Sequence, residues 1–184
     1  MKNLIKLFAI AFFALMCSSA SAQTFKFGHV NFQELIMLTP DYDSATVKFT
    51  TYQQSLEEDL LALQTELQTK LAAYEKNANT WTAALLEMKQ RELQEMNQRT
   101  EDYRQTAAQE LNNMNQVLML PVMEKVSNAI KKIGKEQGFI YIFDISGNAI
   151  PYYNPDQSTD LMEVMKRELN IPLDKKLPTA TPQQ

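Results

Sequence analysis

The sequence predicts an α+β protein in which a long antiparallel helical hairpin, a coiled-coil arm, projects from a small β-rich body. Two long segments carry apolar residues at steps of three and four, and residues 41–76 contain neither Pro nor Gly. A polar Asn-x-Asn separates these segments, and short aromatic, β-branched stretches flank them. We therefore expect an arm at 41–120 with its tip near 77–81, a body at 23–40 and 121–173, and a disordered tail at 174–184.

The first 22 residues have the features of a secretory signal peptide. Two lysines precede the apolar run "LFAIAFFALM", and a small-x-small site ends at Ala22. The apolar run is too short to span a bilayer permanently. We expect export and cleavage after Ala22. The alternative is lipidation of Cys17, but Met16 is bulky where a small residue is normally required.

Cleavage would leave a chain without cysteine, with a single histidine and four glycines. This composition excludes a zinc site built on His and Cys, a cysteine nucleophile and a glycine-rich phosphate loop. We interpret His29 as a packing or surface residue, and we predict no enzymatic activity, no cofactor and no metal.

Negative charge is concentrated in the arm. The chain has 18 basic and 22 acidic residues, and residues 41–120 alone contain 13 acidic and 7 basic residues. Nucleic-acid binding would require a basic face, so no nucleic-acid partner is expected.

The body begins with "TFKFGHVNF", which is typical of a strand. Its apolar alternation shifts by one position at Gly28-His29, which predicts a β-bulge. Asn31 and Glu34 resemble a capping box that opens a short helix, "FQELIML". Thr39 followed by Pro40 predicts the start of the next helix.

The first arm helix has a narrow apolar stripe that indicates a coiled-coil seam. The stripe consists of Phe49, Tyr52, Leu56, Leu60, Leu63, Leu67, Leu71 and Tyr74. At 1.5 Å per residue the helix would reach roughly 50 Å, whereas a compact domain of this size has a radius near ~15 Å. The helix must therefore project from the body.

The second arm helix is predicted from Thr82 to Lys135, with polar residues at seam positions such as Lys89 and Thr100. Its stripe consists of Leu86, Leu93, Met96, Tyr103, Ala107, Leu111, Met114 and Leu118. Two such helices joined by a short turn pack as an antiparallel hairpin. Trp81, at the turn, either covers the open end of the coiled coil or contacts a partner.

Pro121 is predicted to bend the second helix where the arm joins the body. The segment "GFIYIFD" is apolar on both faces, which implies burial on both sides. Residues 146–148 are predicted to form a turn, with "AIPYY" as the returning strand. The final helix is predicted over 158–169, with Leu161, Val164, Met165 and Leu169 on one side.

A body of about 70 residues without disulfides or metal rarely has a sufficient core of its own. We therefore expect other copies of the chain to bury the second face of the strand that follows Gly138. The number of copies is left open at this point. The predicted oligomer core consists of Phe27, Val30, Phe139, Tyr141 and Phe143.

The order of these parts resembles the Skp/OmpH family of periplasmic chaperones. The similarity lies in "FGHVNFQEL", "PVMEKVSNAIKKI", residues 138–155 and the helix opening at Ser158. The resemblance implies a jellyfish-shaped homotrimer in the periplasm. It also implies that helical arms hold unfolded outer-membrane proteins without ATP and prevent their aggregation, with no stable membrane span.

The candidate client contacts are Trp81, Met88, Met119 and Met123, because methionine adapts to unrelated apolar partners. Met96 and Met114 are interpreted as seam residues. The arm departs from the family in being acidic where the best-known members are basic, which places electrostatic capture of acidic clients and lipopolysaccharide binding in doubt. The alternative function is a structural coiled-coil scaffold or spacer of the cell envelope.

Overall fold

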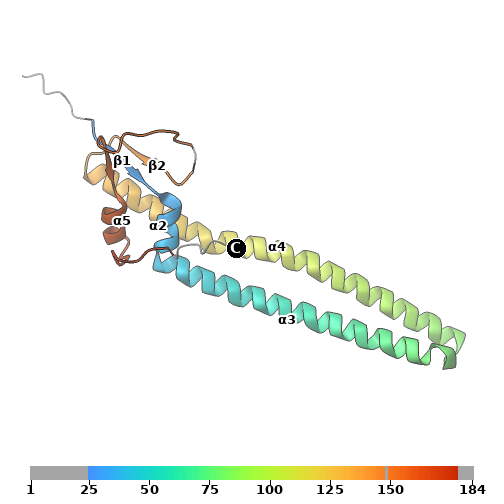
Figure 1. The fold of residues 1–184 in the computed structure, drawn as a ribbon. Coiled ribbons are helices and arrows are strands. Elements are labelled where there is room, and N and C mark those ends of the chain that lie inside the picture. Colours follow the sequence, from blue (N-terminus) through green and yellow to red (C-terminus); the bar gives the residue numbers. More distant parts are fainter. Residues whose placement is uncertain (1–24, 148, 178–184) are drawn as a thin grey trace, which may run out of the picture.

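The computed structural model describes residues 25–147 and 149–177, so the predicted signal peptide lies outside the described residues. A long hairpin of two helices extends from a small body that contains the strands and the short helices (Figure 1). This arrangement confirms the predicted α+β hairpin-and-body fold. The elements are β1 (Phe27–Val30), α2 (Phe32–Leu38), α3 (Pro40–Asn77), the 3-10 turn η2 (Ala78–Thr80), α4 (Ala83–Glu136), β2 (Tyr141–Asp144), β3 (Ser158–Asp160) and α5 (Met162–Glu168).

Polar side chains fix where three of the helices begin. The Asn31 side chain accepts a hydrogen bond from the Glu34 N–H at 3.0 Å, and Thr39 Oγ1 accepts from the Tyr42 N–H at 3.1 Å. Thr82 Oγ1 caps α4 in the same way. These bonds satisfy amides that have no partner within the helix. The predicted helix starts at Asn31 and Thr39 are confirmed.

The arm consists of α3 and the part of α4 that lies beside it (Figure 1). The predicted stripe residues on both helices are buried or half-buried, except the exposed Leu71. Buried Thr100 donates its hydroxyl hydrogen to the Met96 carbonyl at 2.9 Å, so this polar seam position is satisfied within α4. The seam stabilises the hairpin along its length. α4 continues through Pro121 as one helix into the body.

The three strands form one parallel sheet in the order β2-β1-β3. All four residues of β1 pair with β2 in unbroken register, from Phe27 opposite Tyr141 to Val30 opposite Asp144. The predicted bulge at Gly28-His29 was wrong, because the pairing with β2 continues through both residues. Gly28 faces the core, where the lack of a side chain allows Leu161 and Phe139 to pack closely. A Cβ on Gly28 would lie 2.9 Å from Leu161 Cδ1.

The predicted returning strand "AIPYY" was also wrong, since the described residues between β2 and β3 contain no strand. One edge of β1 pairs with β2, and its other edge pairs with Ser158–Asp160. The chain after β2 therefore crosses to the other edge instead of folding back. As a consequence the final helix begins at Met162, four residues later than predicted.

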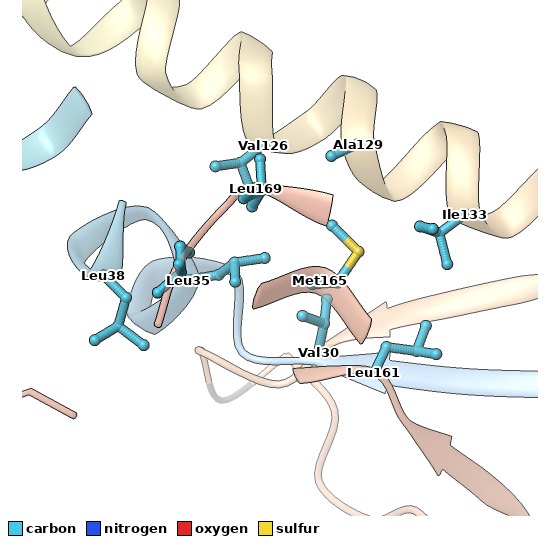
Figure 2. Close-up of a cluster of buried hydrophobic side chains, with 10 residues drawn as sticks. Val30, Leu35, Leu38, Val126, Ala129, Ile133, Leu161, Met165 and Leu169 are labelled. Carbon is cyan, nitrogen blue, oxygen red and sulfur yellow. The ribbon is translucent and has the colours of Figure 1, made fainter. Parts of the chain in front are cut away.

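The body core lies between the sheet, α2, α5 and the last turns of α4 (Figure 2). Val126, Ala129 and Ile133 of α4 point toward Met165 and Leu169 in the α5 region (Figure 2). Leu161, Met165 and Leu169 of the predicted final-helix face are buried, and Val164 packs against the cluster. The buried cluster is Val30, Leu35, Leu38, Val126, Ala129, Ile133, Leu161, Met165, Leu169 and Ile171.

The predicted disorder of the tail was wrong for its first residues. Lys166, only 9% exposed, donates to the Leu173 carbonyl at 3.3 Å and to the Lys175 carbonyl at 2.8 Å. Lys175 Nζ in turn lies 2.6 Å from Asp43 Oδ2 in the first turn of α3, and Leu177 packs against the core. Backbone carbonyls offset the cost of burying the ammonium, and they hold the tail in place. Residues 178–184 lie outside the described residues.

Candidate functional site

One face of the sheet is turned away from the body core and carries aromatic side chains. Gly28 and Val30 face the core, so the alternating residues Phe27 and His29 point to the other side, which we call the outer face. The Phe27, Tyr141 and Phe143 rings stack there with centroids 5.9–6.4 Å apart. Tyr141 is 60% exposed and Phe143 36% exposed. The outer face is therefore an apolar surface that the described residues leave partly exposed.

The predicted oligomer-core residues divide into two groups in the structure. Phe27, Tyr141 and Phe143 lie together on the outer face. Val30 belongs to the buried core of the same chain, and Phe139 packs against that core. Successive side chains of a strand point to opposite faces, so Val30 points to the core while Phe27 and His29 point to the outer face.

A groove extends the outer face into the segment between β2 and β3. Its volume is about 440 Å³, and Ile150, Tyr152 and Tyr153 line it together with Phe27 and Phe143. Sequence reasoning missed this segment because it expected a strand there.

His29 lies beneath the β2–β3 segment and is buried. Its Nδ1 is 2.9 Å from Ser158 Oγ, and its ring centroid is 4.6 Å from that of Tyr153. These contacts place His29 as a packing residue, as interpreted from the sequence.

The arm carries five polar pairs that join α3 to α4. They are Tyr52–Glu110 (2.6 Å), Asp59–Tyr103 (3.0 Å), Glu66–Arg99 (3.7 Å), Lys70–Glu92 and Tyr74–Gln90 (2.7 Å). The α3 members of the first four pairs are separated by seven, seven and four residues, so they follow one edge of the seam. Sequence reasoning missed these pairs, although the heptad spacing of residues 52, 59 and 66 was a signal for them.

Within the arm, the pKa of Glu92 is shifted most strongly. Its carboxylate accepts hydrogen bonds from Lys70 and from Lys89 Nζ, the latter at 2.7 Å. These two ammonium groups, Lys70 first, lower the pKa of Glu92 from 4.5 to about 2. The same contact raises the pKa of Lys70. Glu92 and Lys70 are therefore both charged at neutral pH, and their ion pair joins the two helices near the tip.

We expect the stability of the arm tip to depend on pH through Glu92. Because its folded pKa is lower than its unfolded one, Glu92 stabilises the fold above about pH 4.5, and this contribution disappears as the pH falls toward 2. In urea unfolding followed by Trp81 fluorescence, the midpoint difference between wild type and Glu92→Gln should shrink as pH falls through this window. Glu87→Gln, which removes a pair within α4 alone, is the control. A midpoint difference that is independent of pH would contradict this assignment.

Trp81 lies at the arm tip, directly after η2. Its ring packs edge-on against Tyr74, with centroids 5.8 Å apart and planes at 66°. It is half-buried and lines a small pocket of about 190 Å³ with Ala73 and Leu93. Trp81 thus covers the end of the seam.

The methionines predicted as client contacts differ in exposure. Met88 is 54% and Met123 43% exposed, whereas Met119 is half-buried. Met96 is buried and Met114 half-buried in the seam, as interpreted from the sequence. Sequence reasoning missed four further exposed apolar side chains at or next to the arm, which lie outside the stripes: Val47, Leu61, Val117 and Leu120.

The described residues contain neither a helix long and apolar enough to cross a membrane nor a group of three or more His, Cys, Asp or Glu that could hold a metal ion. Their distinctive features are the outer face of the sheet and the arm. Together these define a class of protein in which a small body of strands and short helices carries one long antiparallel helical hairpin with exposed apolar side chains.

The chain belongs to the OmpH-like family of outer membrane proteins, whose model matches residues 26–169. It is also similar to a solved structure from Caulobacter crescentus CB15, described provisionally as an OmpH-like outer membrane chaperone. That similarity has a TM-score of 0.68 at 15% identity and covers 85% of this chain and 94% of the other. At this identity it establishes the shared fold. No protein with a curated description matches the sequence.

Proposed function

We propose that this protein is an ATP-independent holdase chaperone of the periplasm. It binds unfolded outer-membrane proteins between helical arms and prevents their aggregation before membrane insertion. Membership of the OmpH-like family supports a chaperone role. The predicted signal peptide supports export.

The observation that carries the proposal is the set of apolar side chains left exposed on the arm. Val47, Leu61, Leu71, Met88, Val117 and Leu120 are all exposed, although the seam beside them is closed. Five of them lie outside the apolar stripes, and Leu71, although part of the α3 stripe, is 45% exposed. Single exposed apolar residues are common on protein surfaces, but six of them on one arm offer repeated contact points to clients without a fixed shape.

Assembly through the outer face would complete this function. Phe27, Tyr141 and Phe143 offer each chain an apolar surface that other copies can cover, and the family resemblance implies three copies. Several arms attached to one body would enclose a cavity. Many weak contacts within that cavity raise affinity through effective concentration.

Aggregation suppression tests the proposal. The purified mature protein should suppress light scattering when a denatured outer-membrane barrel protein is diluted into buffer without nucleotide. A natively folded barrel in detergent, which exposes no unfolded segments, should not bind. Absence of suppression at excess chaperone would contradict the holdase role. Capture of one specific folded envelope protein instead would favour the scaffold alternative.

A further inference from the structure

Most cations of the arm are already neutralised within it. Five of its seven basic residues, Lys70, Lys89, Arg91, Arg99 and Arg104, form ion pairs with arm carboxylates. Two more carboxylates, Asp41 and Asp43, pair with Lys125 and Lys175 from outside the arm. The remaining charge is therefore almost entirely negative.

Seven arm carboxylates take part in no ion pair within residues 25–147 and 149–177. They are Glu57, Glu58, Asp59, Glu75, Glu95, Asp102 and Glu110, and only Lys48 and Lys76 balance them. They are spread along both helices. Charges on an exposed surface act over about 8 Å at physiological ionic strength. A segment held against the arm would therefore lie within reach of several of them.

A shallow groove on α3 combines this charge with apolar side chains. Leu61, Ala62 and the unpaired Glu58 line it. The hydroxyls of Thr65 and Thr69 donate to carbonyls of α3 itself, at 2.7 and 2.8 Å, so their hydrogens are not free for a ligand. Glu66 and Lys70 also line the groove and pair with each other.

Lysine and arginine match this groove, because each has an apolar stem and a cationic end. The stem can cover Leu61 and Ala62 while the charge approaches Glu58. Acidic side chains would meet repulsion from Glu58 and from the surrounding carboxylates.

We propose that the α3 groove and the seven unpaired carboxylates select client segments that carry lysine or arginine among apolar residues. This inference rests on the proposed holdase function and names the class of client. Apolar contact holds the segment, and the unpaired carboxylates discriminate between clients of opposite charge.

Two synthetic unfolded peptides test the selection. They share the same apolar residues, and their charged positions are all lysine in one peptide and all glutamate in the other. Fluorescence anisotropy should show that the lysine peptide binds the mature protein about fivefold or more tightly at low salt. The two affinities should converge at high salt because the charges are screened.

Two matched variants distinguish an effect of the arm's own carboxylates from an effect of the protein's net charge. Glu58→Gln/Glu75→Gln/Glu95→Gln removes three carboxylates that have neither an ion pair nor a side-chain acceptor role in the described structure. Glu124→Gln/Glu136→Gln/Asp156→Asn makes the same charge change on exposed body residues that also form no ion pair in the described structure. The lysine preference should fall in the arm variant and persist in the body variant. Leu61→Ser should weaken both peptides. Circular dichroism and mass confirm that each variant folds and assembles as wild type does.

Equal binding of the two peptides by wild type, or preference for the glutamate peptide, would overturn the selection and leave the holdase role intact. An equal loss of preference in both triple variants would overturn the assignment to the arm. Failure to bind either peptide, together with no aggregation suppression, would remove the proposed function itself.

Discussion

Replacing Tyr141 and Phe143 by serine is expected to abolish the proposed assembly through the outer face and leave single chains. Both rings are exposed on the outer face, with their centroids 5.9 Å apart, so their truncation removes little packing within one chain. Aromatic side chains at the centre of an interface typically contribute about 2 kcal/mol or more each. Light scattering at micromolar concentration should therefore show a fall from the wild-type mass to that of one chain.

Val117→Ser provides the control for this loss of assembly. It also removes an exposed apolar side chain, but from the arm. Its mass should equal that of wild type, and circular dichroism should show unchanged helicity in all variants. If the double variant keeps the wild-type mass, or if the wild type is itself a single chain, the outer face is not the assembly surface.

Truncation of Leu161 should have the largest effect on the stability of the body. Leu161 is fully buried, packs onto Gly28 of β1, and donates its backbone N–H to the His29 carbonyl at 3.0 Å. Leu161→Ala leaves a cavity at the junction of the sheet and α5. We expect a loss of about 2–5 kcal/mol in the free energy of unfolding.

Leu173→Ala is the matched control, because Leu173 is the same residue type at an exposed position close in sequence. It should change the unfolding free energy by less than about 0.5 kcal/mol. Urea unfolding at one fixed protein concentration measures both, since assembly would otherwise shift the apparent stability. Equal losses in the two variants would show that Leu161 is not part of the body's essential core.

The long helices could be predicted because their signals are local. The apolar stripes at steps of three and four lie within single segments, and the caps at Asn31 and Thr39 involve amides three residues away. Polar residues between the two stripes indicated a turn. None of these inferences requires knowledge of which distant segments meet.

The strand partners could not be predicted in the same way. "AIPYY" has the composition of a strand, yet Ser158–Asp160 pairs with β1, because pairing depends on which backbone edge is free after the chain has crossed the body. The tail was expected to be disordered from its composition. It is held by carbonyl contacts to Lys166 and by the Lys175–Asp43 pair, which joins residues 132 positions apart.

For this protein, the sequence by itself determined that two helices form a long hairpin, where those helices begin, and that the arm is acidic. The tertiary structure alone decided which aromatic residues face outward, which carboxylates lack a cation, and which strands pair. The physical reason is the range of the interactions: helix periodicity and capping act over a few residues, whereas strand pairing and ion pairing depend on groups brought together only by the folded chain.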